Sequence, residues 1–195
     1  MENAKVKLIG TEILSNQWYT LKKISYEYIK NNGTLQLQHR EVYDRGNGAT
    51  ILLYNKEQGT VILTRQFRLP SFINGNPSGM LIEACAGLLD NDNPEDCIRR
   101  ETEEETGFKI NAVKKIFEAY MSPGSVTEML YFFVAEYTST MREAEGGGID
   151  HEQEDIEVLE IPFEEALNMV ERGEIKDGKT ILLLQHAQLH HLLEN

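Results

Sequence analysis

The amino-acid sequence predicts an α/β protein in which a mixed β-sheet lies between helices, with an antiparallel β-extension at its N-terminus. Residues 5–44 are rich in strand-forming side chains and contain an Asn-Gly turn, which is typical of paired strands. An apolar run at 80–86 leads into a helix from about residue 94 to residue 106, and two further helical patterns close the chain. With 195 residues, 41% of them hydrophobic, the chain can bury one sizeable core.

The N-terminal segment has the pattern of a β-ribbon. From Trp18 to Ile29 it is rich in Tyr and Ile, Asn32-Gly33 suits a tight turn, and residues 35–38 alternate between apolar and polar side chains. We therefore divide the chain into an N-terminal β-extension at 1–45 and a main domain at 46–195.

The main domain combines strands with helices. Its segment 138–155, with Gly146-Gly-Gly at the middle, is either a mobile active-site loop or a plain connector. A turn is expected at 55–59. Strands are expected at 50–54, 61–66, 80–86, 112–120, 131–137 and 156–160, and the closing helices at 163–171 and about 178–193.

The helix at 94–106 has favourable residues at both ends. Asn93 is a good N-cap, Pro94 suits the first helical position, and Gly107 suits the residue just past the last turn. The sequence thus brackets this helix at both ends.

Three glutamates of this helix can converge on one cluster. Glu105 lies roughly 40° around the helix from Glu101, with Glu104 on the other side, because each residue advances by about 100°. A Glu-rich helix face is ordinarily solvated, but such a face interleaves Lys or Arg, whereas here Arg99 and Arg100 stand only on the N-terminal side. Carboxylates are the ligands of hard cations, so the cluster suits Mg²⁺ or Mn²⁺ rather than zinc.

Composition excludes several other classes of protein. The net charge of -13, from 32 acidic and 19 basic residues, argues against a nucleic-acid partner, which demands a basic face. Two cysteines are too few for a disulfide framework or a zinc site. No apolar run approaches the length of a membrane span, and residues 1–5 lack a signal-peptide core. We expect no nucleic-acid or membrane partner and a cytoplasmic location.

Two other motifs suggest different functions. Gly173, four residues, then Gly178-Lys179-Thr180 has the spacing of a P-loop, but residues 163–171 before it look like an amphipathic helix rather than a buried strand. His186 and His190 stand at i, i+4 with no third ligand evident, so we interpret them as surface or interface histidines.

The segment from Gly87 to Phe108 resembles the Nudix box of the Nudix hydrolases. The match is strongest in its second half, Arg100-Glu-Thr-Glu-Glu-Glu-Thr-Gly-Phe, which holds the metal ligands of the box. Twelve residues separate Gly87 from Arg100, one fewer than usual, and the early glutamate of the box falls on Asn93 or Asp92. The resemblance implies a Nudix fold.

The likeness covers nearly the whole chain. Segments 65–68, 83–87 and 120–128 are similar to the nucleoside-diphosphate-sugar pyrophosphatase branch, and segments 38–48, 155–160 and 173–180 to its GDP-mannose pyrophosphatases (NudK). This implies a magnesium-dependent enzyme that converts GDP-mannose to GMP and mannose 1-phosphate. It also implies a homodimer through the N-terminal strands. The rivals are an ADP-ribose pyrophosphatase with the same box, and an inactive nucleotide-sugar-binding module.

The resemblance also assigns roles to individual residues. The metal ligands it implies are Glu101, Glu105 and the Ala86 carbonyl, with Glu104 as a shared catalytic ligand. In the loop after the glycines, Glu154 would serve as metal ligand or general base, and Glu152 is its competitor. The implied substrate contacts are Trp18, His39, Arg40, Glu41, Arg68, Gly87, Glu128, Gln153 and Lys179. Among these, Arg40, Arg68 and Lys179 would bring positive charge to a diphosphate.

Overall fold

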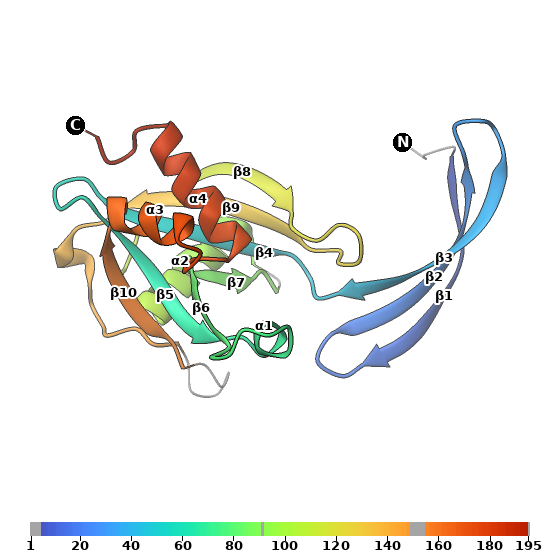
Figure 1. Ribbon diagram of the computed structural model, residues 1–195, viewed down its shortest axis with the longest axis horizontal. Helices are drawn as coiled ribbons and strands as arrows, with labels where there is room; N and C mark the ends of the chain where they lie inside the picture. Colours follow the sequence, from blue (N-terminus) through green and yellow to red (C-terminus); the bar gives the residue numbers. More distant parts are fainter. Residues whose placement is uncertain (1–4, 91, 149–154, 195) are drawn as a thin grey trace. The chain divides into compact units, whose positions relative to one another are not determined.

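The computed structural model describes residues 5–90, 92–148 and 155–194, which form two compact units. One unit comprises Met1–Asn47 and Tyr120–Met129, and the other comprises Gly48–Ala119 and Leu130–Asn195. The expected boundary of the N-terminal extension at residue 45 and the break at Asn47 are two residues apart. Figure 1 shows the N-terminal strands in blue and the elements of the larger unit in cyan to red.

The N-terminal unit is a three-stranded antiparallel sheet in the order β1-β2-β3. Its strands are β1 (Val6–Asn16), β2 (Thr20–Ile29) and β3 (Leu35–Asp44). The turn between β2 and β3 forms at Asn32-Gly33, where the Asn32 side chain accepts a hydrogen bond from the Thr34 N–H at 3.0 Å and Gly33 has a φ of 82°. The Asn-Gly signal in the sequence therefore located this hairpin correctly.

The larger unit contains a seven-stranded mixed sheet with the path β10-β5-β4-β9-β8, in which β6 also pairs with β5 and β7 with β4. Strands β4 and β9 run parallel, while β4–β5, β5–β6, β4–β7 and β5–β10 are antiparallel. The strands are β4 (Gly48–Asn55), β5 (Thr60–Phe67), β6 (Met80–Glu83), β7 (Ala86–Leu88), β8 (Lys114–Tyr120), β9 (Met129–Glu136) and β10 (Glu157–Pro162).

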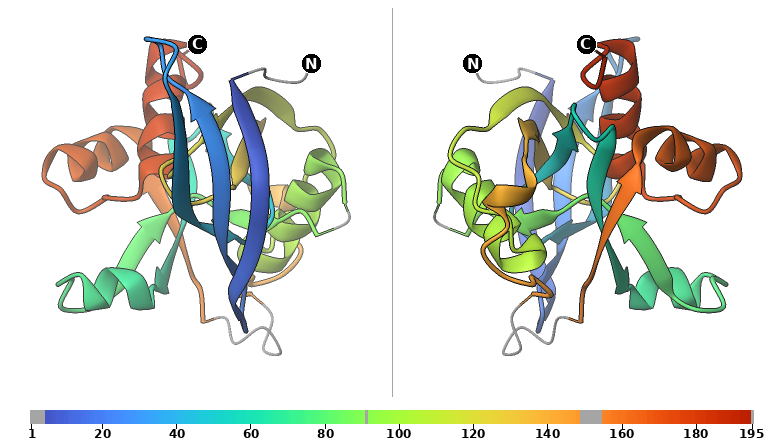
Figure 2. Two further views of the ribbon diagram at one scale, coloured as in Figure 1. Left: turned by 90° about the vertical axis from the view of Figure 1, so that its right-hand side faces the viewer. Right: turned by 90° about the vertical axis from the view of Figure 1, so that its left-hand side faces the viewer.

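Helices cover both faces of this sheet, as Figure 2 shows. Helix α2 (Pro94–Thr106) packs against β4 and β7 on one face, and α4 (Gly178–Leu189) packs against β4 on the other, beside α3 (Phe163–Glu171). Strand β4 is buried on both sides because its alternating side chains, Ile51 and Leu53 against Leu52, meet a helix layer on each face. The predicted mixed sheet between helices is confirmed.

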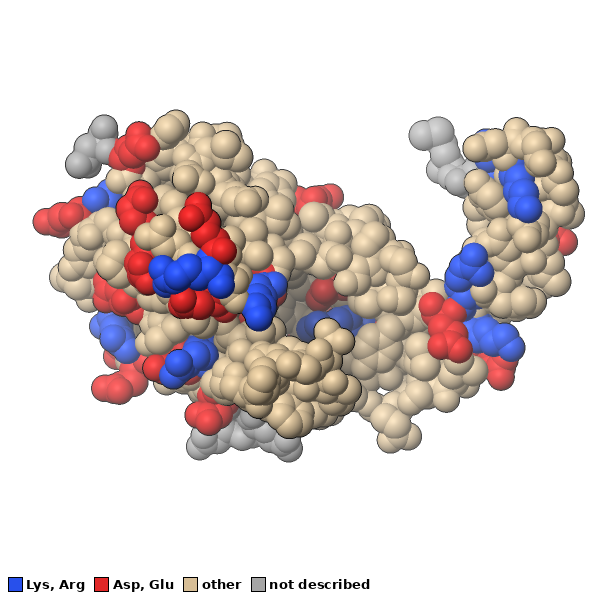
Figure 3. All heavy atoms as spheres, in the orientation of Figure 1, with Lys and Arg blue, Asp and Glu red and all other residues tan. Residues whose placement is uncertain are grey.

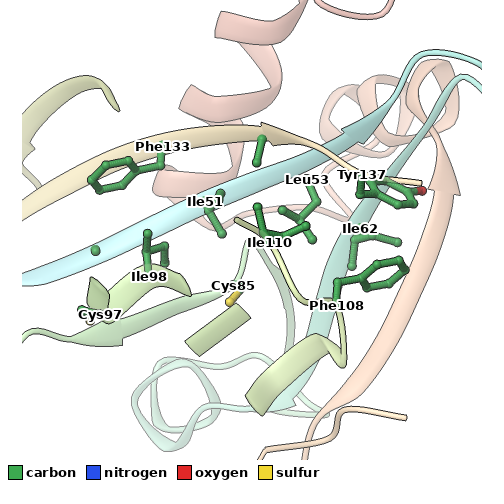
Figure 4. Close-up of a cluster of buried hydrophobic side chains, with 12 residues drawn as sticks. Ile51, Leu53, Ile62, Cys85, Cys97, Ile98, Phe108, Ile110, Phe133 and Tyr137 are labelled. Atoms are coloured by element: carbon green, nitrogen blue, oxygen red, sulfur yellow. The ribbon is translucent and has the colours of Figure 1, made fainter. Parts of the chain in front are cut away.

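The core on the α2 side positions the acidic helix. Figure 4 shows Cys97 and Ile98 of α2 among Ile51, Leu53 and other apolar side chains of the sheet. These buried residues fix which face of α2 turns toward the sheet. The directions of the glutamate side chains are then also fixed, because each position on a helix has a set angle relative to the others.

Three predictions about elements need correction, and one short helix was missed. The apolar run at 80–86 is two strands, β6 and β7, separated by Ala84 and Cys85. A short helix, α1 (Leu69–Ile73), was not predicted because it buries no side chain and so leaves no periodic pattern. Helix α4 ends at Leu189 rather than near residue 193, and strand β8 begins at Lys114 rather than residue 112. No helix among the described residues is long and apolar enough to cross a membrane.

Candidate active site

Helix α2 begins and ends where its sequence predicted. The Asn93 side chain accepts hydrogen bonds from the backbone N–H groups of Glu95 and Asp96, at 3.1 and 3.0 Å, and Pro94 occupies the first turn. Gly107 ends the helix in the left-handed region with a φ of 76°. The box glutamates therefore stand in the last turn and a half of a well-capped helix.

Glu105 is the most enclosed of the three glutamates, with only 2% of its surface exposed. Its carboxylate accepts a hydrogen bond from the Ala86 N–H at 3.3 Å, and the neighbouring Cys85 thiol is hydrogen-bonded to it as well. Burial raises the pKa of Cys85 well above its usual value, and the negative charges of Glu105 and Glu101 raise it further, so this thiol stays protonated and can donate to the Glu105 carboxylate. The strand break before Gly87 thus holds the Glu105 carboxylate.

Glu101 lies directly over Gly87. A Cβ atom built on Gly87 would stand 2.0 Å from the Glu101 Cδ, a distance that only the absence of a side chain permits. Gly87 is itself fixed in the sheet, because β7 pairs with β4 at Ala49. The glycine that opens the box is therefore needed for the close approach of strand and carboxylate.

Arg100 neutralises the outer side of the cluster. Its guanidinium lies 2.9 Å from the Glu101 carboxylate and 2.8 Å from that of Glu104, and its Nε lies 3.6 Å from Asp92. Partial burial lowers the pKa of Arg100, but the charges of Glu101 and Glu104 outweigh this and raise it overall. The like charges that looked crowded in the sequence are thus partly balanced by an arginine from the preceding turn of the same helix.

The described part of segment 138–155 is docked on the C-terminal end of α2. The Gly147 and Gly148 N–H groups donate to the backbone carbonyls of Glu105 and Glu104, at 2.9 and 3.2 Å, carbonyls that a helix end leaves without an intrahelical partner. This part of the segment is anchored, and a 3₁₀ turn at Ser139–Met141 precedes it. The predicted residues Glu152, Gln153 and Glu154 lie outside the described residues.

Arg68 and Lys179, expected at the phosphates, both meet Glu83. The Arg68 guanidinium donates to Glu83 Oε2 through Nε at 3.1 Å and Nη2 at 2.6 Å, and Lys179 Nζ lies 3.5 Å from the same oxygen and 3.0 Å from Asp177. Burial lowers the pKa of Arg68, but the hydrogen bond and charge of Glu83, together with the charges of Glu105 and Asp177, raise it overall. Lys179 is enclosed with 13% of its side chain exposed, whereas Arg68 keeps 41%.

Five predicted substrate residues belong to the N-terminal unit. Trp18 is 75% exposed in the turn between β1 and β2. Glu128 lies 3.5 Å from the Nε of Arg45, whose guanidinium stands over the Tyr19 ring. Strand β3 carries His39, Arg40 and Glu41. Their role at the substrate stays a prediction.

The larger unit therefore brings together Ala86, Gly87, Glu101, Glu104 and Glu105, with Arg68 and Lys179 held by Glu83, a residue to which sequence reasoning gave no role. One signal could have revealed it. A single glutamate in an otherwise apolar strand run is costly to bury unless it is paired, so its position predicts a cationic partner.

The competing motifs are accounted for. Segment 173–180 follows helix α3, as predicted, and its Asp177 side chain caps α4 by accepting from the Thr180 N–H at 3.0 Å. The ring centroids of His186, on α4, and His190, just past its end, lie 4.2 Å apart with the rings tilted by 36°, and the Phe117 ring lies 5.8 Å from that of His186. Burial, followed by the neighbouring His190, lowers the pKa of His186.

The donor set of the cluster fits a hard divalent cation. All its candidate ligands are oxygens, and Gly87 leaves room for the Glu101 carboxylate against the strand. Within residues 5–90, 92–148 and 155–194, no three His, Cys, Asp or Glu side chains already stand in ligand geometry, since Arg100 binds two of the carboxylates.

On the face in Figure 3, basic side chains lie beside acidic ones rather than in one continuous basic area.

Known proteins resemble the chain over nearly its full length. Residues 44–187 match the model of the NUDIX domain, and residues 5–43 match that of the GDP-mannose pyrophosphatase NudK N-terminal domain. A protein from Yersinia enterocolitica named GDP-mannose pyrophosphatase is 57% identical over 192 residues, covering 98% of this chain and 100% of that protein. One of the same name from Enterobacter sp. strain 638 is 58% identical over 97% of this chain and 98% of its own length.

A solved structure supports the same fold. The crystal structure of an ADP compounds hydrolase superposes with a TM-score of 0.70 at 18% identity, covering 94% of this chain and 92% of that one. The capped helix α2, its carboxylates against Gly87 and these matches lead to one conclusion. The chain belongs to the Nudix family of hydrolases, with a NUDIX domain preceded by an N-terminal domain of the NudK type.

Proposed function

We propose that this protein hydrolyses the diphosphate bond of GDP-mannose, releasing GMP and mannose 1-phosphate in a magnesium-dependent reaction. The observation that carries the proposal is the likeness to proteins named GDP-mannose pyrophosphatase, which extends over 97% to 98% of this chain and includes the N-terminal strands. The pairing of Glu101 and Glu105 with the Ala86–Gly87 strand supports it, because it offers oxygen ligands beside a close-packed backbone.

In this proposal the carboxylates and the Ala86 carbonyl would hold the metal. When bound, magnesium would supply neutralising charge at the diphosphate and make a water molecule easier to deprotonate. Glu101 and Glu105 contribute two negative ligands, and Glu104 stands beside them, tied to Arg100. The oxygen of water bonds to phosphorus, the bridging P–O bond breaks, and the leaving phosphate keeps the electron pair. The water proton passes to a carboxylate, for which Glu152 and Glu154 remain the two candidates.

Positive charge at the diphosphate would come from Arg68. Its guanidinium is already oriented by Glu83, which leaves its other donors for a phosphate oxygen. Lys179 is more enclosed and would act as a fixed charge behind it. We also propose that several residues contact the nucleotide or the sugar: Trp18, His39, Arg40, Glu41, Glu128 and Gln153. Gly87 would let the substrate come close to the strand because it has no side chain.

A substrate panel tests this function. The pure protein is incubated with an excess of Mg²⁺ and with GDP-mannose, ADP-ribose, GDP-glucose or UDP-glucose in turn. We expect the highest kcat/KM for GDP-mannose, with GMP and mannose 1-phosphate as products by chromatography. A higher value for ADP-ribose would transfer the assignment to the ADP-ribose pyrophosphatases. Binding of GDP-mannose by calorimetry without turnover would identify an inactive binding module instead.

We propose that the active form is a homodimer joined through the N-terminal strands. The three-stranded sheet leaves large apolar side chains exposed, including Leu8 at 71% and Ile13 at 62%, which exceeds what a small monomeric sheet normally presents to water. Register places these two residues on one face, since they pair with Tyr26 and Lys22 of β2. This face would bury its apolar area against a second copy. The 1–45 extension would thus serve both assembly and substrate contact.

Sedimentation measures this assembly. The wild-type protein should have twice its chain mass of 22.3 kDa, and a Leu8→Lys/Ile13→Lys variant should shift towards the single-chain mass because it buries two charges in the interface. Leu189→Lys, at an exposed apolar position of α4, is the matched control and should leave the mass unchanged. A single-chain mass for the wild-type protein would contradict the dimer.

The cytoplasmic location stays a prediction of the sequence.

A further inference from the structure

The strand break between β6 and β7 is held mainly by side chains, together with one backbone hydrogen bond from the Ile51 N–H to the Cys85 carbonyl. The chain pairs with β5 up to Glu83, opposite Thr64, and with β4 from Ala86, opposite Thr50. Ala84 and Cys85 therefore lie outside the paired registers of both strands, although both are buried. Buried backbone N–H and C=O groups that leave a ladder need other partners, because leaving one unpaired costs most of a hydrogen bond.

Three buried threonine hydroxyls meet this need. Thr64 Oγ1 donates to the Glu83 carbonyl at 3.2 Å, and Thr50 Oγ1 donates to the Cys85 carbonyl at 3.0 Å. The Ala84 N–H donates to Thr180 Oγ1 at 2.6 Å. All three threonines are fully buried, so water does not compete for these bonds. The next N–H along the chain, that of Ala86, donates to Glu105.

Thr180 differs from the other two because it comes from the far face of the sheet. It stands in the first turn of α4, where its hydroxyl both accepts from Ala84 and donates to Asp177 Oδ2 at 2.6 Å. Asp177 in turn lies 3.0 Å from Lys179, which reaches Glu83. Segment 173–180, which has P-loop spacing in the sequence, thus contacts the strand break from the α4 face of the sheet, while α2 contacts it from the opposite face.

We propose that Thr180 is a positioning residue for metal binding, which fixes the Ala84–Ala86 backbone so that the Ala86 carbonyl and Glu105 keep the geometry of a divalent-cation site. The inference rests on the proposed function for the location of that site. Without the hydroxyl, the Ala84 N–H would have to rotate towards another acceptor. Ala86 is two residues away, so its N–H and carbonyl would turn with it and the Glu105 carboxylate would lose its anchor.

The variant Thr180→Val tests the role, because it keeps the shape of the side chain and removes only the hydroxyl. We expect the Kd for Mn²⁺, measured by electron paramagnetic resonance on the substrate-free protein, to rise about tenfold, the lower end of the effect of losing an outer partner of a metal site. Thr180→Ser keeps the hydroxyl and should bind Mn²⁺ as the wild-type protein does. In turnover of GDP-mannose, the half-saturating Mg²⁺ concentration should rise by the same factor.

Two further variants separate positioning from plain stability. Thr60→Val removes a hydroxyl that contacts Tyr137 and Glu160 away from the strand break, so it should leave the Kd for Mn²⁺ unchanged even if it lowers the Tm. Thr50→Val is milder than Thr180→Val, because the Cys85 carbonyl still accepts from the Ile51 N–H at 3.0 Å, and we expect a rise of about threefold. If Thr180→Val does not fold, the Kd of Thr50→Val for Mn²⁺ tests whether the threonine hydroxyls position the metal site.

The proposal is overturned if the threonine variants lose Tm but keep the wild-type Kd for Mn²⁺, or if the wild-type protein binds no Mn²⁺ at all. Failure of the proposed function looks different. In that case GDP-mannose is not hydrolysed, whereas Mn²⁺ still binds and still weakens in Thr180→Val.

Discussion

Replacing Glu105 by Gln should abolish turnover while the protein stays folded. Gln has nearly the same volume, so the packing beneath the Ala86 N–H is kept, but the ligand loses its negative charge. A metal that stabilises transition-state charge contributes several kcal/mol, and about 4 kcal/mol corresponds to roughly a 10³-fold loss in kcat. The measurement is kcat with GDP-mannose at saturating Mg²⁺, together with Tm in the absence of metal.

Glu103→Gln provides the matched control for this prediction. Glu103 lies on the same helix and two residues away, but its side chain is exposed and turned from the strand. It should keep wild-type turnover and Tm. If Glu105→Gln turned over GDP-mannose at the wild-type rate, Glu105 would not be a metal ligand.

Gly87→Ala should give the second-largest effect, with losses of both activity and stability. The added methyl group would stand 2.0 Å from Cδ and 2.4 Å from Cγ of Glu101, so the carboxylate must move. A misplacement of about 1 Å at a reacting centre costs roughly 10²-fold in rate. Because these are the outer atoms of a flexible side chain, the overpacking cost lies at the low end, about 1 kcal/mol, which for a chain of this size lowers the Tm by a few degrees.

A double-mutant cycle with Glu101→Ala identifies the cause of that loss. Removing the Glu101 side chain clears the space that the added methyl group would occupy, so Gly87→Ala should destabilise the Glu101→Ala protein much less than the wild-type protein. Gly10→Ala adds a methyl group where no other heavy atom lies within 4 Å and should change neither property. Equal destabilisation in both backgrounds would show that Glu101 is not what the methyl group meets.

The elements most accurately predicted from sequence are those whose signals are local. The helix at 94–106 has its stop and start residues within its own sequence, and the structure places it at Pro94–Thr106. Helix α3 carries a clear apolar stripe and was also placed at its observed bounds. Helix α1 carries no such stripe, because it buries nothing, and no local pattern could reveal it.

The strand break shows where sequence reasoning ended. Residues 80–86 form one apolar run, and nothing in that run shows that the chain leaves β5 at Glu83 and joins β4 at Ala86. Pairing partners are chosen by residues far along the chain, so a single run of apolar residues cannot encode a change of partner. The same applies to Thr180, whose hydroxyl meets the Ala84 N–H across 96 residues of sequence.

The sequence by itself determined the helix, its glutamates and the glycine before them, because helical spacing sets where side chains three and four residues apart must lie. Only the tertiary structure decided that Arg68 and Lys179 share Glu83, that Arg100 binds Glu101 and Glu104, and that three threonines hold the strand beneath Glu105. Such contacts depend on which elements pack together, and the burial of apolar surface over the whole chain settles that packing.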